Sequence, residues 1–178
     1  MTKKPSSPDD AKIGPIVSSA HLVAPGAEEL SEFEFGLYIA NNAFERWIVR
    51  CMAAAGTSDM SALDVMVLHT IYHRGREKRL ADICLVLNIE DSYTVTYALK
   101  KLTRLELISG RKNGKEKLFS VTEKGGLACE EYRKIRDACL VEPFGVSTPP
   151  NDKVRNLASL LRALSGLYDQ ASRAATSL

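Results

Sequence analysis

The sequence lacks the features that would place the chain in a membrane or among enzymes with a known motif. No stretch is apolar and long enough to span a bilayer, and residues 1–28 hold too few apolar side chains for a signal-peptide core. The chain has no CxxC pair, no HExxH helix and no nucleophile elbow. We therefore expect a cytoplasmic protein that is not an enzyme and needs no cofactor, with residues 1–28 as a flexible arm.

One segment superficially resembles a phosphate-binding loop. Gly110 and Gly114 are followed by Lys115, but only three residues separate the glycines where that loop needs four. Glu116 also stands where the loop requires Ser or Thr. We therefore exclude a nucleotide-binding loop of this type.

Cysteine and histidine are few, and the cysteines have no CxxC spacing. The four cysteines lie on helical patterns, mostly near the apolar side, and we interpret them as reduced core thiols. They are Cys51, Cys84, Cys129 and Cys139. His69 and His73 have the i, i+4 spacing that can chelate a metal on a helix. The alternative, which we favour, is that they interact with the C-terminal end of the helix dipole, so no metal site is predicted.

Positive charge is concentrated in one segment. The 178 residues carry a net charge of only +2, with 45% hydrophobic and 26% charged residues, as is ordinary for one soluble globular domain. Residues 100–124, however, hold eight cationic and three acidic side chains, a net +5, which leaves −3 for the rest. Such a concentration suits phosphate neutralisation, although a solvated surface is the alternative.

A helix with one apolar face precedes and overlaps the basic segment. Val95, Leu99 and Leu102, continued by Leu105 or Leu107, keep helical spacing. The opposite face carries hydroxyls and cations, on Ser92, Tyr93, Thr96, Tyr97, Lys100 and Arg104. Hydroxyls and cations can contact base edges in a major groove and the flanking phosphates, so the pattern indicates a DNA recognition helix.

The pattern then changes from helical to alternating. Residues 107–108 and 118–121 read as two short strands around Asn113-Gly114, a dipeptide that hairpin turns favour. The sequence therefore predicts a basic hairpin, or wing, directly after the recognition helix.

Two shorter helices are predicted upstream. Ser61 and Asp64 have the spacing of a helix cap before a helix that runs to Gly75, whose apolar positions are Leu63, Met66, Val67 and Ile71. A second helix over residues 79–87 has apolar positions at Leu80, Ile83, Cys84 and Leu87. Asp91 is a plausible N-cap of the recognition helix. Helix, turn, helix and hairpin in this order predict a winged helix-turn-helix.

Long amphipathic segments flank this module. Residues 29–55 predict one long helix that ends at Gly56, and a further helix is expected at about 127–140. A last helix has apolar positions at Val154, Leu157, Leu160, Leu161, Leu164, Leu167, Tyr168 and Ala171. The apolar faces of the first and last helices exceed what a small winged module could cover, which favours a two-fold dimer interface over an intramolecular helical subdomain.

The ordered set of motifs resembles the MarR family of transcription regulators over residues 30–175. The resemblance rests on SALDVMVLHTI, LADICLVLNI, YTVTYALKKLTRLELI and LFSVTEKG. Two positions depart from the family pattern: Asn113-Gly114 replaces an Asp and Arg at the wing tip, and Tyr97 stands where an Arg often follows the helix Thr. The wing lysines at positions 112, 115 and 117 are the natural substitutes for that arginine.

The resemblance implies a mainly α fold with a small β-hairpin wing, acting as a homodimer on double-stranded DNA. It also implies a small-molecule effector that binds between the dimer helices and the DNA module, and some family members sense oxidants through a thiol. The rival interpretation is a protein-interaction module that has lost DNA binding, for which the altered wing tip is the best argument.

The resulting prediction is a single domain over residues 29–178. It contains a winged helix module at 57–125 and dimerisation helices at 29–56 and 126–178. The predicted DNA contacts are Ser92, Tyr93, Thr94, Thr96, Tyr97, Lys100, Lys101, Arg104, Arg111, Lys112, Lys115 and Lys117.

Overall fold

The structure, a computed structural model, describes residues 28–145 and 152–178. The arm predicted at residues 1–28 lies outside the described residues except for Glu28, which begins the first helix. The chain divides into two compact units, one ending at Cys129 and the other beginning at Glu130. Each unit is described by itself.

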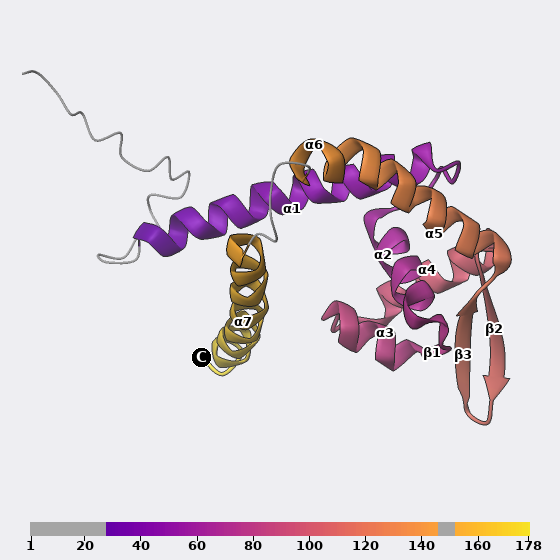
Figure 1. Cartoon of the computed structure of the whole chain (residues 1–178). Coiled ribbons are helices and arrows are strands. Elements are labelled where there is room, and N and C mark those ends of the chain that lie inside the picture. Colours follow the sequence, from indigo (N-terminus) through magenta and orange to yellow (C-terminus); the bar gives the residue numbers. More distant parts are fainter. Residues whose placement is uncertain (1–27, 146–151) are drawn as a thin grey trace, which may run out of the picture. The chain divides into compact units, whose positions relative to one another are not determined.

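The first unit contains the winged module and the long helix before it. Its elements are α1 (Glu28–Ala54), α2 (Ala62–Tyr72), the 3₁₀ turn η2 (His73–Gly75), β1 (Lys78–Arg79), α3 (Leu80–Leu87), α4 (Ser92–Arg104), β2 (Ile108–Asn113), β3 (Glu116–Val121) and the start of α5 (Glu123–Arg136). The β2–β3 hairpin projects beyond the helices of this unit (Figure 1). The predicted order of helix, turn, helix and wing is confirmed.

Local capping explains where the module's helices begin and end. The Ser61 side chain accepts a hydrogen bond from the Asp64 N–H, and the Asp64 carboxylate accepts one from the Ser61 N–H, which is the predicted cap of α2. The left-handed backbone of Asn88, with φ 52°, ends α3. The Asp91 carboxylate then accepts from the Tyr93 N–H and begins α4, as predicted.

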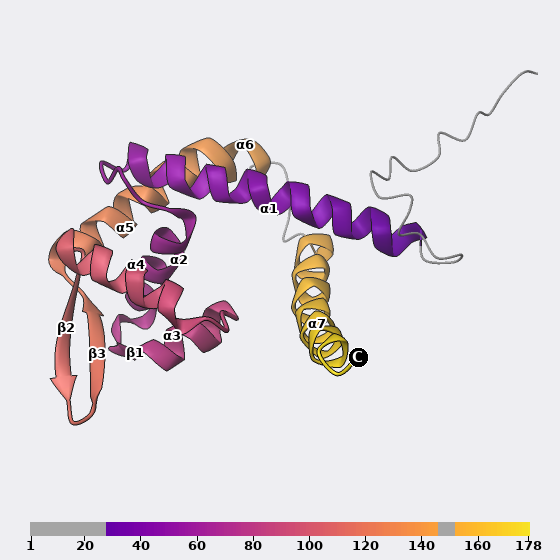
Figure 2. The same ribbon diagram turned by 180° about the vertical axis from the view of Figure 1, so that it is seen from behind.

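The core of the module lies where α2, α3 and α4 meet the sheet (Figure 2). The predicted apolar stripe of α4 is confirmed, since Val95, Leu99 and Leu102 are all buried. The set of apolar positions predicted for α2 was too small. Val65 and Leu68 are fully buried beside Val67 and Ile71, because neighbours cover this helix on more than one side.

The wing belongs to a three-stranded antiparallel sheet in the order β1-β3-β2. The sequence missed β1, and both predicted strands are longer in the structure. The turn is at Gly114, whose φ of 62° favours glycine, as the Asn-Gly signal predicted. Gly110 pairs with Phe119 and Arg111 pairs with Leu118. Side chains alternate along a strand, so this register decides which wing residues share a face.

The second unit continues α5 and ends in a long helix. The helix predicted at 127–140 begins earlier, at Glu123, and its α-helical part ends at Arg136. A π-helical turn, η3 (Asp137–Val141), and the short α6 (Glu142–Gly145) follow. The last helix, α7 (Asp152–Ala175), has no buried residue. The predicted fold class, mainly α with a small β wing and long flanking helices, is confirmed.

Two of the four cysteines do not fit the prediction of core thiols. Cys51 and Cys129 are buried, as predicted, whereas Cys84 is half-buried and Cys139 is exposed. Cys139 lies in the π-helical turn, where the pattern used for the prediction no longer follows α-helical geometry. Among the described helices, none combines the length and hydropathy needed to cross a membrane.

Candidate nucleic-acid interface

The exposed face of α4 carries aromatic hydroxyls and cations, as the sequence predicted. Tyr93 and Tyr97 are 74% and 70% exposed, one helical turn apart. The Lys100 ammonium lies 5.5 Å from the centre of the Tyr97 ring, so the aromatic face helps to orient this cation. Ser92, Thr94 and Arg104 are also exposed.

Threonine hydroxyls on α4 donate their protons within the helix. The Thr96 Oγ1 donates to the Ser92 carbonyl at 2.9 Å, and the Thr94 Oγ1 donates to the Asp91 carbonyl at 2.8 Å. Each hydroxyl oxygen therefore keeps its acceptor capacity. Thr96 is suited to accept a hydrogen bond from the amino group of adenine or cytosine at a base edge.

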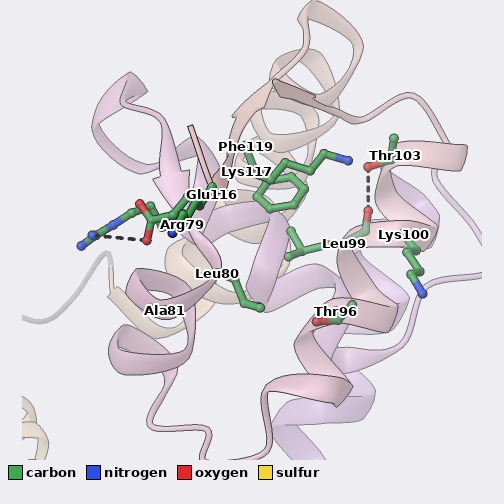
Figure 3. A pocket seen from close by; sticks show the side chains of 11 residues that line it. Arg79, Leu80, Ala81, Thr96, Leu99, Lys100, Thr103, Glu116, Lys117 and Phe119 are labelled. Carbon is green, nitrogen blue, oxygen red and sulfur yellow. Dashed lines mark hydrogen bonds and ion pairs between the residues drawn. The ribbon is translucent and has the colours of Figure 1, made fainter. Parts of the chain in front are cut away.

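A groove of about 610 Å³ separates α4 from the wing, and we call it the wing–helix groove. Leu80, Leu99 and Phe119 converge on its apolar floor, which comes from α3, α4 and β3 (Figure 3). Its rim bears four cations and one carboxylate, on Arg79, Lys100, Lys115, Lys117 and Glu116. Thr96 also lines the groove, so a hydroxyl of α4 meets cations from both α4 and the wing there.

The wing places two lysines on the face that looks toward α4. Lys112 pairs with Lys117 across the hairpin, and both share a face with Phe119 because side chains alternate. The Lys117 ammonium lies 5.3 Å from the centre of the Phe119 ring. A Cβ atom at Gly110 would collide with the Lys117 side chain. Because Gly110 has no side chain, the Lys117 side chain can lie across the wing.

Arg111 points to the opposite face of the wing and is already paired. Its guanidinium donates two hydrogen bonds to the Glu77 carboxylate, at 2.7 and 2.6 Å. This bidentate contact lowers the pKa of Glu77 and raises that of Arg111. The structure therefore separates Arg111 from Lys112 and Lys117, although the sequence groups all three as DNA contacts.

Arg79 belongs to the groove but was not among the predicted contacts. It precedes α3 and donates to Asp82 at 2.7 and 3.0 Å, and a further ion pair joins it to Glu116 at 3.8 Å. The hydrogen bonds from Arg79 lower the pKa of Asp82 to about 2. The sequence signal was the Arg79-x-x-Asp82 spacing, which resembles a helix cap.

Lys101 also differs from the prediction in its surroundings. Its ammonium lies 3.1 Å from the Asp64 carboxylate at the start of α2, and its side chain is 26% exposed. Lys100, the next residue, is exposed and lines the groove. The structure thus brings most of the predicted residues together around α4 and the wing, while Lys101 and Arg111 are held by carboxylates of the module.

The histidine pair does not form part of a metal cluster in the described chain. His73 is exposed in the turn after α2, whereas burial lowers the pKa of His69. Within residues 28–145 and 152–178, no group of three or more His, Cys, Asp or Glu side chains is placed to hold a metal ion.

Comparison with known families identifies the module. Residues 60–125 match the winged helix DNA-binding domain family, a range that covers α2 to the start of α5 and includes the wing–helix groove. No curated protein sequence matches the chain.

Solved structures share the fold over most of the chain. AbfR of Staphylococcus epidermidis superposes with a TM-score of 0.64 at 17% identity, covering 79% of this chain and 93% of that one. NMB1585, a MarR family regulator from Neisseria meningitidis, gives 0.59 at 22% identity, with 80% and 95% covered. CouR from Rhodococcus jostii RHA1 gives 0.61 at 14% identity, with 75% and 91% covered.

The winged module therefore matches a winged helix DNA-binding domain family, and the chain that carries it has the fold of MarR-type regulators. The resemblance to MarR-type regulators that the sequence suggested is thereby confirmed for the fold.

Proposed function

We propose that this protein is a homodimeric transcription regulator that binds specific sequences in double-stranded DNA. In this proposal α4 enters the major groove, and the wing lies along the backbone or the minor groove. Two such heads would contact half-sites about one helical turn apart.

The observation that carries the proposal is the composition of the wing–helix groove and its surroundings. Thr96 and Tyr97 supply groups for base edges, while Lys100, Lys115 and Lys117 supply charge for phosphates. Thr96 and the three lysines come from two separate elements and line one groove, with Tyr97 beside Lys100, on a module that matches a DNA-binding family. A surface that is merely solvated would not require a hydroxyl and several cations from two elements to line the same groove.

The proposed contacts are predicted residues on these two elements that are exposed or, in the case of Thr96, half-buried. They are Ser92, Tyr93, Thr94, Thr96, Tyr97, Lys100, Arg104, Lys112, Lys115 and Lys117. Lys101 and Arg111 are left out because each is paired with a carboxylate of the same module.

The dimer is supported by the helices outside the module. In α7, Leu157, Leu160 and Leu167 are 50%, 51% and 59% exposed, all on one side of the helix. In α1, Tyr38, Ile39 and Phe44 are at least half exposed. A second copy of the chain would cover such faces at a two-fold interface.

Selection of bound fragments from a genomic library tests this proposal. The purified full chain should enrich a limited set of sites that share two related half-sites. A matched protein with Thr96→Ala and Tyr97→Ala should lose this enrichment while it still binds random DNA. Failure of the wild-type protein to retain any duplex at low salt would instead favour the alternative, a protein-interaction module that keeps the winged fold.

A small-molecule effector completes the proposal. The support is the fold shared with CouR, whose structure holds p-coumaroyl-CoA. Once a site is known, release of the protein from DNA can be measured with a panel of aromatic acids and their CoA thioesters. A panel that leaves the affinity for DNA unchanged would count against effectors of this chemistry.

A further inference from the structure

Two adjacent lysines of the recognition helix have different surroundings. Lys100 is exposed beside Tyr97 and the wing–helix groove. Lys101 points about 100° around the helix from it and reaches the beginning of α2. There its ammonium lies 3.1 Å from the Asp64 Oδ2 and 3.9 Å from the Asp59 Oδ1.

Asp64 is a fixed and buried carboxylate. Its side chain is 5% exposed and accepts a hydrogen bond of 2.7 Å from the Ser61 N–H. The Asp64 N–H donates back to the Ser61 Oγ at 3.1 Å, so the cap of α2 holds the carboxylate in place. A carboxylate this far from water needs a cation, and Lys101 provides it.

This ion pair joins the start of α2 to the second half of α4. Residues 55–61, the segment between α1 and α2, contain Asp59, which also faces the Lys101 ammonium. Since Lys101 follows Lys100 directly, the pair limits rotation of α4 about its own axis and fixes where the exposed face points. The hydrophobic contacts of Leu99 and Leu102 hold α4 on the core. They are less directional than the ion pair between Lys101 and Asp64.

We infer that Lys101 is a positioning residue for DNA recognition. Its ion pair with Asp64 sets the rotation of α4 on α2, so that Tyr97 and Lys100 face the DNA, and Lys101 itself does not contact DNA. The inference rests on the proposed function.

Neighbouring single variants separate positioning from contact. Lys101→Met should lower affinity for the selected site by at least about fivefold while the dependence of binding on salt stays that of the wild type. Lys100→Met, the matched control, should reduce the slope of log K against log salt by about 0.9 for each phosphate that is no longer neutralised. Lys101→Arg, which keeps a cation that can reach Asp64, should restore most of the affinity that Lys101→Met removes.

The partner variant completes the comparison. Asp64→Asn keeps an oxygen for the Ser61 N–H but removes the charge, so it should lower affinity for the selected site as much as Lys101→Met does, with a smaller loss on random DNA. The double variant should lose no more than the larger single loss, because both remove the same pair. Simple destabilisation would instead lower binding to the selected site and to random DNA by the same factor.

Lysine acylation read by mass spectrometry tests the wild-type protein without any substitution. Lys101 should react slowly both free and on DNA, whereas Lys100 should react readily when free and become protected on DNA. A Lys101 that reacts readily when free and is protected by DNA would overturn the positioning role and leave the proposed function intact. If DNA protects neither lysine and no duplex is retained, the proposed function fails and Lys101 has no recognition helix to position.

Discussion

The winged module and the long flanking helices bury their apolar residues to very different extents. Within the module, the 11 residues of α2 bury four apolar side chains, namely Val65, Val67, Leu68 and Ile71. The 24 residues of α7 bury none, although leucines recur along one side of that helix. The module of about 65 residues therefore forms a buried core, to which the end of α1 contributes, while α7 exposes its apolar face.

The first long helix shows the same contrast along its own length. Toward its C-terminal end, Ile48, Cys51 and Met52 are buried, and α1 packs on α2. In its middle, Tyr38 and Ile39 are exposed. The apolar side chains change from buried to exposed where α1 leaves the module, which is the arrangement expected of a helix that serves two interfaces.

The largest expected effect comes from placing charge on the apolar side of α7. Leu160→Glu combined with Leu164→Glu should convert the proposed dimer to a monomer, because two carboxylates per chain would have to be desolvated at the interface. Loss of the second head should weaken binding to a two-half-site DNA by about 10²-fold or more. Light scattering coupled to size exclusion measures the mass, and fluorescence anisotropy measures the affinity.

A control pair of glutamates belongs on the polar side of the same helix. Ser159→Glu with Gln170→Glu adds the same charge to exposed positions away from the leucines, and it should leave mass and affinity unchanged. A wild-type chain that runs as a monomer at micromolar concentration would defeat the dimer proposal directly.

Much of the fold could be predicted from local patterns. Helical periodicity gave α1 and α4 within a few residues, and the Asn113-Gly114 dipeptide gave the turn of the wing. The two-residue strand β1 was not predictable in this way. Lys78 and Arg79 form a strand only because they pair with Phe119 and Leu118, about 40 positions later in the chain.

The sequence predicted which residues of the candidate site lie on the exposed face of α4, but it did not predict which carboxylates pair with its cations. Periodicity placed Tyr97 and Lys100 on the exposed side of α4, and the structure agrees. Nothing local indicated that Lys101 would meet Asp64, or that Arg111 would meet Glu77, 34 residues upstream. Ion pairs between distant segments depend on tertiary packing, so composition alone made both cations resemble DNA-binding residues.

A second prediction separates assembly from DNA binding. Lys112→Ala, Lys115→Ala and Lys117→Ala together should weaken binding to every duplex, on the order of 100-fold at 0.1 M salt, and lower the salt slope by about 0.9 for each phosphate that a lysine no longer neutralises. Because the module folds around its own core, the mass of the particle and the melting temperature should stay close to those of the wild type. A salt titration of binding measures the slope. An unchanged slope would remove the wing from the interface.

A third prediction concerns sequence preference within the module. Thr96→Ala or Tyr97→Ala should cost roughly 1 to 3 kcal/mol of discrimination between the selected site and random DNA, because each side chain is proposed to reach a base edge. Since the Thr96 hydroxyl proton is used by the Ser92 carbonyl, Thr96→Ser should retain the preference and serve as the matched control. Competition binding with both DNAs measures the ratio. Equal losses on both would assign these side chains to phosphate.

The smallest expected effect distinguishes the two faces of the wing. Arg111→Gln should change the salt slope by clearly less than the roughly 0.9 expected for one phosphate contact, because its guanidinium is held by Glu77 on the face opposite to Lys117. Glu77→Gln should weaken that hold and make Arg111 available to DNA, so the salt slope should rise. Titration of binding against salt for both variants measures this, and a drop of the full amount in Arg111→Gln would return this residue to the interface.

The same pair has a defined dependence on pH. Arg111 lowers the pKa of Glu77, so the stabilisation is present above the ordinary carboxylate pKa and is lost as pH falls through the lowered value. The small difference in melting temperature between wild type and Glu77→Gln should therefore be constant near neutral pH and shrink in acid. A difference that persists unchanged in strong acid would show that the Glu77 carboxylate, and hence its pairing with Arg111, is not its source.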